Sequence, residues 1–149
     1  MTSESTDVQF EYDKSVVGVD VELGSFEITP EQVKAYCEAL EETNPLYADG
    51  TLAPPGIFSS VSFGRGQGLD AKVQFGNASF MAGQRMEFHQ PVRSGQTYHA
   101  KTQVKEVYSK TGRSGTMVFV VRRTEFTDAE DNLVAASEQS QVHREVEGR

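Results

Sequence analysis

Apolar and polar residues alternate with a period of two through most of the stretch Gly83–Arg144. Between Tyr98 and Val104, for example, apolar residues and a threonine alternate with more polar residues. Such alternation is typical of strands with one buried face. The runs are separated by short breaks rich in Gly, Ser, Asp and Asn, which are of hairpin length, so neighbours in sequence are expected to pair in one antiparallel meander. The expected strands are Gln84–Gln90, Gln96–Tyr108, Thr116–Phe126 and Leu133–Arg144.

The chain before this stretch predicts two helices. Thr29 is a suitable N-cap, Gln32 completes a capping box, and an apolar stripe follows at helical spacing. This helix should stop near Thr43, because Asn44 precedes a proline. A second, glycine-rich helix is expected over Gly56–Leu69, where close contact with a sheet would offset the weak helix propensity of glycine. Since an apolar sheet face must be covered, the prediction is an α+β domain with an antiparallel sheet wrapped around a long central helix.

Length and composition change this picture little. A chain of 149 residues is expected to form one domain over 1–149, with solvated tails at 1–8 and 145–149. Cys37 is the only cysteine, so no internal disulfide can form, and no apolar run approaches the length of a membrane span. We therefore expect a soluble cytoplasmic protein. The formal net charge of −8 argues against nonspecific binding to nucleic acid or to an anionic membrane.

Several short motifs resemble, in the same order, those of the MaoC-like hotdog family, and most closely its FAS1-like dehydratase N-terminal type. The block Gly83–Thr97 resembles the strand–turn–strand of that family. Three upstream stretches follow the family's order, namely Ile28–Gln32, Asn44–Asp49 and Ala53–Pro55. With the last hairpin around Thr124–Val134, the resemblance covers about residues 20–145.

The resemblance implies a hotdog fold that pairs with a second hotdog, as a homo- or heterodimer, so that two sheets become continuous. It also implies hydration of trans-2-enoyl thioesters, or dehydration of (3R)-hydroxyacyl thioesters, carried by CoA or acyl carrier protein in fatty acyl metabolism. No metal or redox cofactor is expected, and the three histidines lack the spacing of metal ligands.

Catalytic members of this family carry the motif D-x-N-P-x-H, and this chain departs from it. Asn44 and Pro45 match, but Glu42 stands where the aspartate would be and Tyr47 where the histidine would be. A glutamate could still act as a base if burial raised its pKa, whereas a tyrosine, with an ordinary pKa of about 10, is poorly suited to replace histidine. We therefore expect a subunit that lacks the full Asp/His dyad and shapes an acyl channel beside a catalytic partner, as in the mycobacterial (3R)-hydroxyacyl dehydratases.

The candidate site residues follow from this mapping. The catalytic candidates are Glu42, Asn44 and Tyr47. The candidates for contact with the thioester are Pro45, Asp49, Pro54, Pro55, Phe58, Arg65 and His89. Simpler interpretations stay open: Tyr47 could pack on the core, Asp49 could form a turn, and His89 could be a surface histidine.

Two other functions remain as alternatives. The first is a noncatalytic hotdog that only binds an acyl thioester or only supports a complex. The second is a hotdog thioesterase, which would need a carboxylate on the central helix to activate water. The expected helix Gly56–Leu69 has none and Asp70 lies only at its end, so this alternative ranks last. The acyl chain, its carrier and the composition of the dimer are left open.

Overall fold

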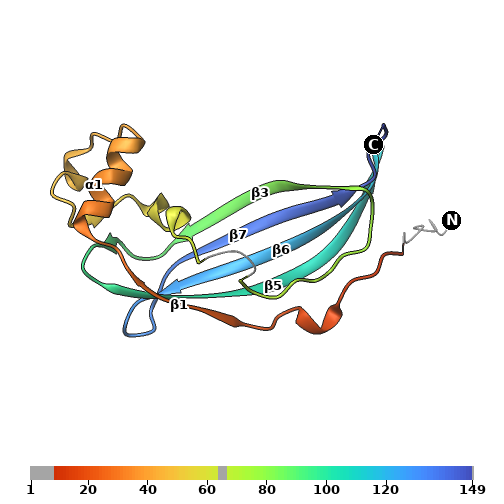
Figure 1. The fold of residues 1–149 in the computed structure, drawn as a ribbon, viewed down its shortest axis with the longest axis horizontal. Coiled ribbons are helices and arrows are strands. Elements are labelled where there is room, and N and C mark those ends of the chain that lie inside the picture. Colours follow the sequence, from red (N-terminus) through yellow and green to blue (C-terminus); the bar gives the residue numbers. More distant parts are fainter. Residues whose placement is uncertain (1–8, 64–66, 149) are drawn as a thin grey trace.

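The computed structural model describes residues 9–63 and 67–148 (Figure 1). In chain order the elements are η1 (Lys14–Val16), β1 (Val21–Glu27), α1 (Pro30–Ala39), η2 (Pro45–Tyr47), β2 (Leu52–Ala53), η3 (Pro55–Ser60), β3 (Ala78–Phe88), β4 (Val92–Arg93), β5 (Thr97–Gly112), β6 (Gly115–Thr127) and β7 (Leu133–Arg144). The elements labelled η are 3-10 helices. In the described part of the chain, no helix has both the length and the apolar character needed to cross a membrane.

The main sheet is antiparallel and has the strand order β1-β5-β6-β7-β3. The expected meander is confirmed for β5, β6 and β7, which pair in sequence order. It is wrong for the first strand, because β3 pairs with β7 instead of β5. The break between them is more than a hairpin turn: it contains β4, which pairs with β2 in a small second sheet. As a result β3 lies at one edge of the main sheet and β1 at the other (Figure 1).

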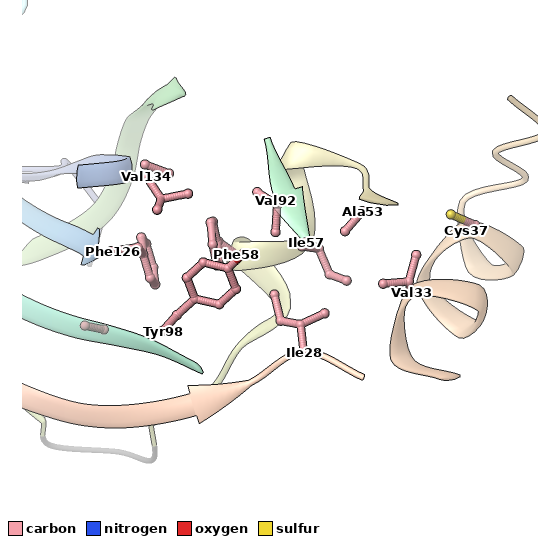
Figure 2. Close-up of a cluster of buried hydrophobic side chains, with 12 residues drawn as sticks. Ile28, Val33, Cys37, Ala53, Ile57, Phe58, Val92, Tyr98, Phe126 and Val134 are labelled. Atoms are coloured by element: carbon pink, nitrogen blue, oxygen red, sulfur yellow. The ribbon is translucent and has the colours of Figure 1, made fainter. Parts of the chain in front are cut away.

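One face of the sheet, here called the inner face, holds the main hydrophobic core at one end. The ring of Phe58 in η3 stacks on Phe126 of β6, with 4.6 Å between ring centroids, and meets the ring of Tyr98 of β5 edge-on at 5.2 Å. All three side chains are almost fully buried (Figure 2). Residues directly opposite each other in an antiparallel pair share a face, so the register assigns every other strand residue to the inner or the outer face.

The expected long helix over Gly56–Leu69 is wrong in extent. Only the 3-10 helix η3 forms there, and it ends at Ser60 because Val61 has extended backbone dihedrals (φ −77°, ψ 125°). No described residue from Val61 to Leu69 is helical. Gly68 has φ +88°, and a Cβ at this position would lie 2.7 Å from Nη1 of Arg122. Glycine is needed there for a positive φ and a close approach to the sheet rather than for a helix.

A segment without regular secondary structure, residues 67–77, takes the place of the long helix and is called the strap below. Figure 1 shows the strap in yellow-green, running from the middle of the sheet to the start of β3. Nη2 of Arg122 on β6 donates a 2.6 Å hydrogen bond to the carbonyl oxygen of Leu69. Ala71 packs against Val104 of β5 in a second buried cluster. The backbone N–H of Asp13 donates to the carbonyl oxygen of Ala71. The N-terminal arm, residues 9–20, thus holds the strap on the β5–β6 half of the sheet.

The helix α1 confirms its predicted start but not its end. Both capping-box hydrogen bonds are present between Thr29 and Gln32. The helix ends at Ala39, four residues before the expected Thr43, because Glu41 takes up a left-handed conformation (φ 56°).

The expected C-terminal tail 145–149 is partly wrong. Val146 is tied to Asn77 by two hydrogen bonds: its N–H donates to Asn77 Oδ1 at 2.8 Å, and Asn77 Nδ2 donates to its carbonyl oxygen at 3.0 Å. The expected N-terminal tail 1–8 lies outside the described residues.

An ion-pair network crosses the outer face. The guanidinium of Arg123 lies 3.5–3.6 Å from the carboxylates of Glu87, Glu125 and Glu138. Lys105 Nζ donates a 2.5 Å hydrogen bond to Glu138, whose side chain is only 12% exposed. The Lys105 hydrogen bond lowers the pKa of Glu138, against the opposing effect of burial. These residues link β3, β5, β6 and β7 across the face opposite the core.

Phe58→Ala should lower the free energy of unfolding by about 3–5 kcal/mol, because it removes a buried ring from the centre of the core. Urea denaturation followed by circular dichroism measures this change. Leu40→Ala removes an apolar side chain that is 59% exposed and should change stability by less than about 0.5 kcal/mol. A small loss for both variants would show that η3 is not anchored by Phe58.

Glu138→Gln should lower the free energy of unfolding at neutral pH by about 1 kcal/mol, since it removes charge-assisted hydrogen bonds at a mostly buried site. Because the folded-state pKa of Glu138 is lowered, its stabilisation is fully present above the ordinary value of 4.5 and is lost as the pH falls through the folded-state value. Urea denaturation of both proteins at a series of pH values should therefore show a difference that shrinks in acid. A difference independent of pH would contradict the assignment, and the exposed Glu130→Gln is the matched control.

Candidate functional site

The loop after α1 carries the three catalytic candidates and is built by local hydrogen bonds. The backbone N–H of Glu42 donates to the carbonyl oxygen of Cys37 at 2.8 Å, which turns the chain back toward the helix. Oε1 of Glu42 then accepts the N–H of Asn44 at 2.9 Å, and Oδ1 of Asn44 accepts the N–H of Leu46 at 3.0 Å. Pro45 occupies the first position of η2. Both polar side chains therefore shape the loop.

Glu42, Asn44 and Tyr47 come together around one cavity of about 230 Å³, which Cys37 and Lys34 also line. The ring of Tyr47 is partly buried and packs against the main core. Glu42 and Asn44 are exposed. The structure thus brings the three candidates to one place, but as an open, solvated pocket without a histidine among its lining residues.

Cys37 forms the inner wall of this pocket. Burial raises the pKa of its thiol, and the negative charge of Glu42 raises it further. The thiol is therefore protonated near neutral pH, and a protonated thiol is a weak nucleophile. Cys37 therefore serves as a small buried hydrophobic residue.

The seven candidates for thioester contact are scattered. Pro45 and Asp49 are exposed, and Oδ1 of Asp49 accepts the N–H of Thr51, which lowers the pKa of Asp49 as in an ordinary turn. His89 is exposed beyond the end of β3, with Nε2 3.6 Å from Glu87. Arg65 lies outside the described residues.

Pro54 is the N-cap residue of η3, and Pro55 and Phe58 lie within this helix. The helix η3 lies between two further cavities. Towards α1 lies a cavity of about 500 Å³, lined by apolar, aromatic and polar side chains that include Tyr36, Ile57 and Gln32. The hydroxyl of Tyr36 comes so close to Gly56 that a Cβ there would lie 2.8 Å away. Towards the sheet lies a narrower cavity of about 130 Å³, with Phe58 in its wall.

Sequence reasoning missed a set of polar residues on the inner face of β7. These residues, called the β7 stripe below, are Ser137, Gln139, Gln141 and His143. Ser137 and Gln139 line the narrow cavity beside Phe58, while Gln139, Gln141 and His143 line an adjoining cavity of about 340 Å³. Their alternation is visible in the sequence, but only the strand order shows that they point to the inner face.

Comparison with protein-family models gives a match over residues 15–137 to the family described as "FAS1-like, dehydratase domain region". The chain belongs to this FAS1-like dehydratase family. The resemblance noted from the sequence motifs is thereby confirmed. A sequence comparison with curated proteins gives no match.

Solved structures show that this FAS1-like dehydratase chain has the hotdog fold. The HadBC (3R-hydroxyacyl-ACP dehydratase) complex from Mycobacterium tuberculosis aligns with a TM-score of 0.60 and 19% identity, over 85% of this chain and 96% of that chain. The ChsH1–ChsH2 complex from the same organism aligns with a TM-score of 0.65 and 14% identity, over 95% of this chain and 85% of that chain. The (R)-hydratase PhaJ1 from Pseudomonas aeruginosa aligns with a TM-score of 0.58 and 16% identity, over 93% of this chain and 90% of that chain.

Native Cys37 should react slowly with a thiol reagent such as DTNB and should react fully once the FAS1-like domain is unfolded in urea. Glu42→Gln removes the nearby negative charge and should speed native labelling modestly, because the thiol pKa falls. The absorbance of the thiolate released from DTNB measures the labelling rate of each protein. Fast labelling of the native wild type would contradict the packing of α1 against the core.

Proposed function

We propose that this chain is the dyad-poor subunit of an enoyl-thioester hydratase or (3R)-hydroxyacyl-thioester dehydratase, active only with a second hotdog chain that carries the full Asp/His dyad. The observation that carries the proposal is the local geometry of the D-x-N-P-x-H position. Glu42 accepts a loop N–H there, and Tyr47 packs its ring on the core. The two side chains are therefore not arranged as a pair that could hold a water molecule and transfer a proton.

The charge around the pocket also supports a partner-dependent reaction. Glu38 and Glu42 line it together with a single cation, Lys34. Hydration of an enoyl thioester builds negative charge on the thioester oxygen, which hydrogen-bond donors or cations stabilise and carboxylates do not. The chain's own contribution is therefore to bind and orient the acyl thioester, while the partner supplies the acid/base pair.

The edge strand β3 is the surface to which a second hotdog chain would pair. It is 11 residues long, and in the described sheet only the edge facing β7 is paired. Phe80, Met81 and Phe88 expose 42%, 63% and 45% of their surface along it. A long, unpaired edge with exposed apolar side chains is a template for strand addition. HadBC and ChsH1–ChsH2 are complexes, which is consistent with such a partner.

A noncatalytic thioester-binding or structural role is the second candidate, and the substitution at Tyr47 favours it. Under this alternative the complex would bind acyl-CoA without turnover.

The direct test assays hydration of crotonyl-CoA and longer enoyl-CoAs by the chain alone and by the chain co-purified with its hotdog partner. The complex should turn over at least about 100-fold faster than the chain alone, the contribution expected from a positioned acid/base pair. Glu42→Gln in this chain should leave kcat of the complex within about twofold.

Two results would reject this assignment. Robust turnover by the pure chain that Glu42→Gln abolishes would place the chemistry in this subunit. No turnover by the complex, with thermal stabilisation by acyl-CoA, would favour the binding role instead.

A further inference from the structure

In the part of the chain that the structure describes, the inner face is only partly covered. The strap covers β5 and β6. There Arg122 donates a hydrogen bond to the backbone of the strap, and Ala71 of the strap is buried against Val104 and Val120. The strap leaves β7 uncovered, since Gln139 and Gln141 on that face are exposed. On the outer face of the same strand the neighbouring Val142 is only 7% exposed. The sheet is thus more open on the side where a hotdog fold normally packs its helix.

The open surface is elongated, and apolar side chains such as Met81 and Val120 lie beside the polar β7 stripe. From Ser137 to His143 the β7 stripe spans about 20 Å at roughly 3.3 Å per residue. The two cavities along it meet at Gln139, which lines both. One end is walled by aromatic residues that include Phe58 and Phe126, and the other end is lined by Gln141 and His143.

The stripe retains hydrogen-bonding capacity. Gln141 uses Nε2 to donate to Ser79 on β3 at 2.7 Å, which leaves its carbonyl oxygen as an acceptor. The carboxamide of Gln139 makes no hydrogen bond to a described residue. A carboxamide can both donate and accept, so two of them on one face suit a ligand with amide, carbonyl or hydroxyl groups.

We propose that the β7 stripe binds an extended ligand chain carrying amide, carbonyl or hydroxyl groups, with Gln139 and Gln141 as the recognising residues. This inference rests on the proposed thioester-binding function. In an acyl thioester, such amide, carbonyl or hydroxyl groups belong either to the pantetheine arm or to an oxygenated acyl chain. The apolar end of the surface, beside Phe58, takes an aliphatic part of the same ligand.

The test measures binding of CoA, decanoyl-CoA and ω-hydroxydecanoyl-CoA to the full chain, in complex with its hotdog partner where one co-purifies, by isothermal titration calorimetry. The variant Gln139→Leu/Gln141→Leu removes both carboxamides at exposed positions, where leucine should be tolerated. Gln103→Leu is the matched control, because Gln103 lies opposite Arg123 on the outer face. Unchanged thermal unfolding confirms folding, and Gln139→Val/Gln141→Val replaces the double variant if it aggregates.

The double variant should bind about fivefold more weakly than the wild type, because the net contribution of one hydrogen bond corresponds to a change of this size. The control should bind as the wild type does. A loss for all three ligands places the pantetheine arm on the stripe. A loss for ω-hydroxydecanoyl-CoA alone places an oxygenated acyl chain there. If all three ligands bind wild type and double variant equally, the inference is overturned while the proposed function stands. If none binds the wild type, both fail together.

Discussion

The packing of Phe58 against Phe126 and Tyr98 is the interaction on which the rest of the structure depends. These three rings place η3 at one end of the inner face. Ile57, next to Phe58, packs in the same core as Val33 and Cys37 of α1 (Figure 2). The core thus joins the sheet, η3 and the loop that bears Glu42 and Tyr47. Aromatic pairs contribute packing beyond their buried area and fix ring geometry, so they can hold a helix of six residues that has little stability of its own.

The short helix determines how the rest of the inner face is used. Beyond η3 the chain crosses the sheet as the strap, and Arg122 and the N-terminal arm hold it over β5 and β6. The β7 side stays open and polar. On the outer face the ion-pair network around Arg123 links four strands. The domain therefore presents an open inner surface and an unpaired edge at β3, and the proposed function relies on these two features.

Much of this architecture was predictable from local sequence. The capping box of Thr29 and Gln32 and the buried face of β5 follow from spacing alone, and the order of short motifs identified the family. The strand order was not predictable, because the break that contains β4 looks like a hairpin turn. The extent of the helix was not predictable either: the same glycines fit a helix wrapped by a sheet and a strap pressed against one. Glu42, Asn44 and Tyr47 were found together because they are neighbours in sequence, whereas the β7 stripe depends on long-range register.

The central claim is that the strap crosses the inner face without forming a long helix and leaves β7 open. Backbone NMR assignment of the full chain tests it most directly, through the Cα and carbonyl secondary shifts of residues 61–63 and 67–77. The structure predicts non-helical shifts in both stretches, after a short helical signal that ends at Ser60. Continuous helical shifts from Gly56 to Leu69 would contradict it, because a long helix there would cover the inner face in place of the strap.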